Sequence, residues 1–123
     1  MPVLVFEFDG RRGWLLRNVG NGPALNVVVA QKHVQGAKRG TWFDAVRVPP
    51  IGRDAEFTLG WLGYRGDTGL GVLYDDFAAP DEGGRSYTST CGNDLNRTYV
   101  GSRFGPFTEV EIRAHWKADA APG

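Results

Sequence analysis

Aromatic and basic side chains gather in two stretches of the chain. Trp61 and Tyr64 lie in a glycine-rich segment, and Arg97, Tyr99 and Arg103 follow further along. Exposed aromatic rings stack on sugars or on a partner peptide, and arginine is enriched at protein interfaces. These five residues are the candidate binding residues. The alternatives are a loop tryptophan that covers the edge of the fold and, for the second stretch, an additional strand.

The side chains that would serve metal or nucleophilic chemistry are scattered. His33, Cys91 and His115 stand alone, without the Cys-x-x-Cys or His-x-x-x-His spacing of metal sites. The sequence contains no Gly-x-Ser-x-Gly elbow and no phosphate-binding loop, and the Gly-Leu-Gly at 69–71 lacks the third glycine of a dinucleotide fingerprint. We therefore expect no catalytic residue, no metal site and no cofactor.

Four carboxylates lie close together in the sequence, at Asp75, Asp76, Asp81 and Glu82. Gathered in one loop they would attract calcium, although their spacing is not that of an EF-hand. A solvated acidic loop is the simpler interpretation. A metal-dependent hydrolase built from three of these acids and a histidine is retained as an alternative function.

The composition describes an ordinary globular chain of 123 residues with one cysteine, which excludes an internal disulfide. Lys and Arg number 14, as do Asp and Glu, so the net charge is zero and no nucleic-acid partner is expected. No apolar run approaches the ~20 residues of a membrane helix, and the first residues lack a signal-peptide pattern. We expect no direct membrane insertion and leave the localisation open.

Apolar and polar residues alternate with a period of two along most of the chain, which indicates strands. Trp14, Trp42 and Trp116 are expected in the core, and the segment from Ala24 begins as a strand buried on both faces because Val-Val-Val at 27–29 favours extended backbone. The expected strands span 3–8, 13–18, 25–33, 41–48, 54–59, 69–75, 85–91 and 107–117, the last with Val110, Ile112, Ala114 and Trp116 facing inward and His115 on the polar side.

Short strands at regular spacing, separated by glycine and proline turns, predict an all-β, immunoglobulin-like antiparallel β-sandwich of about seven to eight strands. A closed barrel is the competing architecture. We expect one domain over residues 1–117, followed by a disordered tail at 118–123.

The most specific stretch spans residues 16–27, Leu-Arg-Asn-Val-Gly-Asn-Gly-Pro-Ala-Leu-Asn-Val. Asn18 is placed to bond its amide to the turning backbone, Gly20 and Gly22 to take positive φ, and Pro23 to end the turn. The stretch resembles the strand–turn–strand signature of bacterial immunoglobulin-like β-sandwich domains, including those related to the adhesion-type CARDB domains.

The resemblance extends over roughly residues 3–90, through Pro-Ile-Gly at 50–52, Tyr-Asp-Asp at 74–76 and Gly-Arg-Ser-Tyr-Thr at 84–88. It implies a non-catalytic interaction or structural module of a larger bacterial protein, in which such domains follow membrane helices or accompany other domains. The expected partner is a protein or a second copy of the chain, met through end loops or an uncovered strand edge. A carbohydrate-binding module is the main alternative. The triplet Asn-Arg-Thr at 96–98 also matches the N-glycosylation motif, which is short enough to arise by chance.

Overall fold

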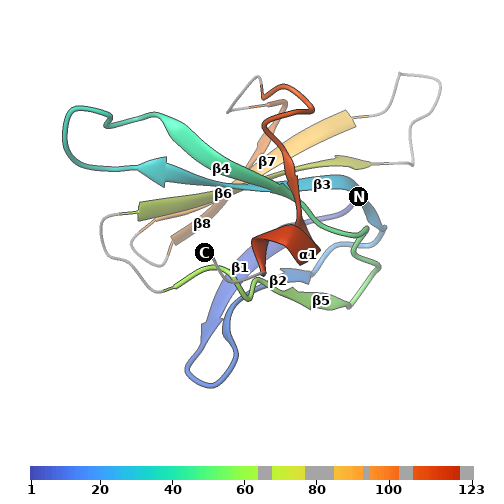
Figure 1. The fold of residues 1–123 in the computed structure, drawn as a ribbon. Coiled ribbons are helices and arrows are strands. Elements are labelled where there is room, and N and C mark those ends of the chain that lie inside the picture. The colour runs from blue at the N-terminus through green and yellow to red at the C-terminus, as the bar shows by residue number, and fades with distance from the viewer. Residues whose placement is uncertain (64–67, 77–84, 93–94, 103–106, 120–123) are drawn as a thin grey trace.

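The computed structural model describes residues 1–63, 68–76, 85–92, 95–102 and 107–119. The described elements are β1 (Leu4–Asp9), β2 (Gly13–Asn18), β3 (Ala24–His33), β4 (Trp42–Arg47), β5 (Glu56–Thr58), β6 (Thr68–Asp76), β7 (Arg85–Gly92), β8 (Leu95–Val100), β9 (Arg113–Ala114) and the helix α1 (His115–Ala118). They form a three-stranded sheet, β1-β2-β5, and a six-stranded sheet, β8-β7-β6-β3-β4-β9. Figure 1 shows these sheets as two layers. The all-β fold with two sheets is confirmed.

The main core lies between the two sheets, where the strands direct alternate side chains inward. Trp14 is 8% exposed, as expected for a core tryptophan. The three-stranded sheet contributes Leu4, Phe6, Trp14 and Leu16, and the six-stranded sheet contributes Val27, Val29, Val46, Val72, Tyr74 and Tyr87. The period-two pattern of the sequence therefore identified the inner faces of β1, β2 and β6.

Asn18, at the end of β2, is the polar centre of the turn that leads into β3. Its side chain is fully buried. Its Oδ1 accepts hydrogen bonds from the backbone N–H groups of Val3 (3.3 Å) and Gly20 (3.0 Å). Its Nδ2 donates to the carbonyl oxygens of Gly22 (2.8 Å) and Ile51 (3.0 Å). The predicted bond between this amide and the turning backbone is confirmed, and the amide also ties the turn to two distant segments.

The glycines of this turn serve a different purpose from the one expected. Neither Gly20 nor Gly22 has a positive φ. A Cβ on Gly20 would lie 2.5 Å from the backbone nitrogen of Val3 and 2.7 Å from the carbonyl carbon of Pro2. Gly20 is therefore required because the N-terminal backbone passes against it, which the local sequence does not reveal.

The predicted strand at 107–117 is wrong. Only Arg113 and Ala114 are extended, as β9, which pairs in parallel with β4, and α1 follows at once. Val110 is 95% exposed and Trp116 65% exposed, so neither lies in the core. The alternation of this segment does not come from pairing within a sheet.

This segment covers the outer face of the six-stranded sheet instead. Phe107 and Ile112 pack on an apolar cluster formed by Val28, Ala30 and Ala45. The prediction that the Val-Val-Val part of β3 is buried on both faces is thereby confirmed. Outer-face ion pairs between Arg113 and Asp44 and between Arg47 and Glu109 join the same segment to β4.

Two further expectations concern the chain from 95 to 118. The stretch around Arg97 and Tyr99 is equally open to an interaction loop or an additional strand from the sequence, and the structure shows a strand there, β8. The expected tail boundary at 118 falls inside α1, where Ala118 is buried in the core between the sheets. Residues 120–123 lie outside the described residues.

Side chains from the six-stranded sheet form hydrogen bonds with the backbone of β1. The Leu4 N–H donates to the hydroxyl of Tyr74 (3.2 Å), and the Phe6 N–H donates to Oδ1 of Asn96 (2.9 Å). Nδ2 of Asn96 donates in turn to the carbonyl oxygen of Phe6 (2.9 Å). The amide nitrogen that a glycan would modify at the Asn-Arg-Thr triplet is therefore engaged with the backbone of β1.

The outer face of the three-stranded sheet carries paired charges. Arg17 lies between Glu7 (3.1 Å) and Glu56 (2.9 Å). Arg12 pairs with Asp9 (3.0 Å) and with Glu56, whose hydrogen bond raises the pKa of the Arg12 guanidinium. The charges of this face are thus largely satisfied within the fold.

Candidate functional site

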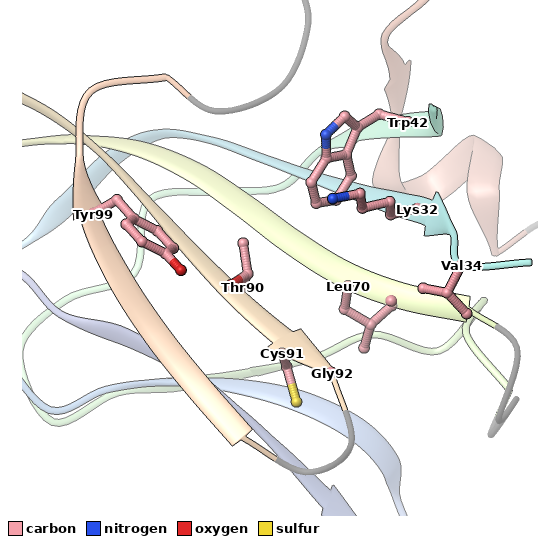
Figure 2. A pocket seen from close by; sticks show the side chains of 9 residues that line it. Lys32, Val34, Trp42, Leu70, Thr90, Cys91, Gly92 and Tyr99 are labelled. Carbon is pink, nitrogen blue, oxygen red and sulfur yellow. The ribbon is translucent and has the colours of Figure 1, made fainter. Parts of the chain in front are cut away.

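A cleft of about 440 Å³ opens in the six-stranded sheet, at the end where β3 stops and β6 begins. Its volume lies within the range of small-ligand sites. Figure 2 shows Trp42 and Lys32 on one side, Tyr99 on the other and Thr90 between them. Four different strands, β3, β4, β7 and β8, supply these four side chains.

The floor of the cleft is hollow because the strands carry glycines there. Gly69 and Gly71 are two residues apart on β6, so they belong to the same face of the sheet. Gly71 pairs with Ala30 on one side and with Thr90 on the other. Gly69 and Gly92 line the cleft directly. A strand of ordinary residues would fill this volume with side chains.

One wall combines an indole ring with a positive charge. Lys32 and Trp42 are register partners on β3 and β4, and both are half-buried. The Nζ atom of Lys32 lies 5.3 Å from the centroid of the indole ring, within the distance of a cation–π interaction. This contact holds the ammonium group at the cleft.

The opposite wall is β8. Tyr99 lines the cleft and is half-buried. Arg97 lies two residues before it, so it belongs to the same face of the strand, and it pairs with Thr90. The cleft is therefore aromatic on both sides, with hydroxyl groups and cations nearby.

The structure brings together two of the five predicted binding residues. Tyr99 is in the cleft, and Arg97 is on the same face beside it. Trp61 is half-buried and packs against the core between the sheets, away from the cleft. Tyr64 and Arg103 lie outside the described residues.

Sequence reasoning missed Lys32 and Trp42 as site residues. Trp42 was assigned to the core because it alternates with Val46, yet the sheet register places it beside Lys32 on the outer face. The available signal was the Gly-x-Gly at 69–71, since two glycines two apart in a strand leave one face bare.

The histidines and the cysteine have structural neighbours. His33 stacks on Phe43 with ring centroids 4.0 Å apart, and His115 meets the ring of Phe57 edge-on at 5.5 Å. Cys91 is buried, forms no disulfide and lines the cleft. Across the part of the chain that the structure describes, no three metal-ligating side chains come together.

The predicted acidic loop is only partly described. Asp75 accepts hydrogen bonds from the amide of Asn26 (2.9 Å) and the hydroxyl of Ser86 (2.7 Å). Asp81 and Glu82 lie outside the described residues. The Asp75 carboxylate therefore has a structural role within the sheet.

A second, smaller groove of about 280 Å³ lies beside α1. It is lined by Pro49, Pro50 and Trp116 among others, and its surface is almost entirely apolar. Among the described lining residues of this groove, the ring that meets Trp116 is that of His115, edge-on at 5.1 Å, and no second tryptophan or tyrosine forms an opposite wall. Trp116 is therefore a suitable comparison residue for the tryptophan of the cleft.

Comparisons with models of protein families, with curated proteins and with solved structures returned no match. Among the described residues, no helix has the length and apolar character needed to cross a membrane. Function is therefore inferred from the geometry of the cleft.

Proposed function

We propose that this chain is a non-catalytic binding module and that the cleft between Trp42 and Tyr99 takes a saccharide. The observation that carries the proposal is the pairing of two aromatic walls across a glycine floor. The apolar face of a sugar ring packs against aromatic rings, and its hydroxyl groups bond to side chains such as Thr90. A concave site of this size accepts a sugar unit better than a flat protein surface.

The described lining favours binding over reaction. The polar side chains among the described lining residues are those of Lys32, Thr90, Cys91 and Tyr99, a set that suits the holding of a ligand. We propose a non-catalytic role on this ground. A metal-dependent hydrolase stays an alternative prediction, as does the absence of a nucleic-acid partner.

The topology of the sheets and the origin of the chain are part of the same proposal. We propose an immunoglobulin-like topology and a bacterial parent protein, as the resemblance to CARDB-like domains implies. The bonds of Asn18 to the turn at 20–22 support the motif on which that resemblance rests. The parent protein would present the cleft to glycans in its surroundings.

The proposal predicts that loss of either aromatic wall weakens glycan binding. Trp42→Ala and Tyr99→Ala are each expected to reduce affinity about tenfold, because each removes a stacking surface. Gly69→Val is expected to weaken binding as well. A Cβ at Gly69 meets only ordinary contacts, the nearest at 3.5 Å from Val34 and 3.7 Å from Lys32, and we expect the larger side chain to take up part of the cleft.

The measurement is tryptophan fluorescence and calorimetry against neutral and acidic oligosaccharides, with Trp116→Ala as the matched control. This control removes an exposed tryptophan outside the cleft and should leave affinity unchanged. If no oligosaccharide binds the wild-type protein, or if Trp116→Ala weakens binding as much as Trp42→Ala, the cleft is not a saccharide site.

A protein partner or a second copy of the chain is the second candidate, and β8 is the observation that favours it. β8 ends the six-stranded sheet among the described strands, and its Leu95 and Val100 are 61% and 68% exposed. An open edge strand pairs readily with another strand. Light scattering over a range of concentrations should then show dimers that Val100→Lys abolishes, whereas a constant monomer mass would contradict this candidate.

A further inference from the structure

We propose that the saccharide of the cleft is acidic and that its oxyanions pair with Lys32 and Arg97; this inference rests on the proposed function of the cleft. Lys32 is the charged residue among the described lining residues. It makes no ion pair with a described carboxylate, although its ammonium is held over Trp42. An anionic group of a ligand would supply the counter-charge for this half-buried ammonium.

Acidic side chains on the outer face of the six-stranded sheet have hydrogen-bond or ion-pair partners within the fold. Asp44 is bound by Arg113 and Gln31, and Asp75 by Asn26 and Ser86. Glu109 pairs with Arg47 and is the third acid of this face with an established partner. The acids named here are therefore neutralised or hydrogen-bonded within the fold.

Arg97 is the second cation without a described carboxylate partner on this face. It is exposed on β8 and shares the face of Tyr99. Within the described residues, Lys32 and Arg97 place two positive charges at the cleft, and none of the described lining residues is acidic. An acidic ligand is favoured at such a surface over a neutral one of the same shape.

The sheet also sets the spacing of these two cations. Lys32 is on β3 and Arg97 on β8, with β6 and β7 between them. Three strand spacings separate the two backbones by about 14 Å. The bases of the two side chains are too far apart for one oxyanion to contact both. The arrangement therefore suits a chain of sugar units that carries acid groups at intervals. Thr90 and the glycine floor lie between the two strands, and Tyr99 follows Arg97 two residues further along β8.

The test compares an oligogalacturonide with its fully methyl-esterified form, which keeps the backbone and loses the charge. The wild-type protein should bind the acid about tenfold more tightly at low salt, and added salt should reduce this difference. A sulfated oligosaccharide forms a third arm and distinguishes sulfate from carboxylate as the preferred oxyanion. Tighter binding of either acidic ligand than of the ester supports the inference.

Three variants assign the charge effect to residues. Lys32→Met keeps the apolar stem on Trp42 and should weaken binding of the acid about five- to tenfold, with little effect on the ester. Arg97→Met should act in the same direction. Lys38→Met, which removes a cation from the exposed loop after β3, is the control and should change nothing.

The outcomes separate this inference from the proposed function. If the acid and its ester bind equally and both respond to Trp42→Ala, the cleft binds saccharides but the acidic preference is wrong. If Lys38→Met weakens binding of the acid as much as Lys32→Met, the preference comes from general charge and not from the cleft. If none of the three oligosaccharides binds, both proposals fail.

Discussion

Asn18→Asp is expected to lower the free energy of unfolding by about 3–5 kcal/mol, because it places a carboxylate without a counter-charge in a fully buried site. The substitution keeps the size of the side chain and replaces its NH₂ group by oxygen. That oxygen would face the carbonyls of Gly22 and Ile51, which now accept from Nδ2 at 2.8 and 3.0 Å. Two acceptors then lose their donor and meet a negative charge.

Thermal and urea denaturation measure this loss, and a fall in Tm of roughly 10–20 °C is expected for a domain of this size. Asn21→Asp makes the same chemical change at an exposed position of the same turn and should cost less than about 0.5 kcal/mol. Equal stability losses in the two variants would show that charge in the turn, and not the buried amide of Asn18, is responsible.

The pH dependence of Asn18→Asp has a defined sign. Burial and the two facing carbonyls raise the pKa of the introduced carboxyl above its unfolded value of about 3.9. Its penalty is therefore smallest below that unfolded value, where the protonated group donates one hydrogen bond, and it grows as the pH rises through the raised pKa. Relative to wild type, the variant should thus regain stability as the pH falls from 7 towards 4.

The strands were predictable where the pattern that defines them is local. The segment 13–18 was predicted with the bounds that β2 shows, and 25–33 with bounds within one residue of β3. In each, turn residues stand at the ends. Local sequence is sufficient there because the apolar residues that favour the strand are also the ones that bury it, on the inner face in β2 and on both faces around Val28 in β3.

The C-terminal segment was mispredicted because its alternation has a long-range cause. Ile112 is half-buried because it covers Val28 and Ala45, which lie far away in the sequence. Arg113 bonds to Asp44 across 69 residues at 2.9 Å, a contact that no sequence window contains. A segment that crosses the face of a sheet and a segment that extends the sheet can show the same pattern.

The residue types of the binding site could be predicted from the sequence, but the residues that face one another across the cleft could not. Tyr99 was identified because an aromatic residue among arginines is typical of binding surfaces. Its opposing wall depends on the register between β3 and β4, which shifts between Val29 and Gln31. This shift in register determines the side of the sheet on which Trp42 lies, and no residue in the sequence indicates the shift.

Tyr74→Ala is expected to lower the free energy of unfolding by about 3–5 kcal/mol, because it leaves a cavity between the sheets. The ring is fully buried and stacks on Tyr87 with centroids 5.8 Å apart. Tyr74→Phe keeps the ring and removes the hydroxyl that accepts from the Leu4 N–H at 3.2 Å. It should cost about 1–3 kcal/mol, since a buried backbone donor then loses its partner.

The hydroxyl of Tyr74 also contacts Oγ of Ser89 at 2.7 Å, and Ser89 in turn contacts Oγ1 of Thr98 at 3.0 Å. A double-mutant cycle with Tyr74→Phe and Ser89→Ala should therefore give a coupling energy of about 0.5–3 kcal/mol. Tyr87→Phe is the control, because that hydroxyl makes no hydrogen bond to another described residue, and it should be nearly neutral. If Tyr74→Phe is as mild as the control and the cycle shows no coupling, packing of the ring alone joins the two sheets at this point, and the chain of hydroxyl groups contributes nothing to stability.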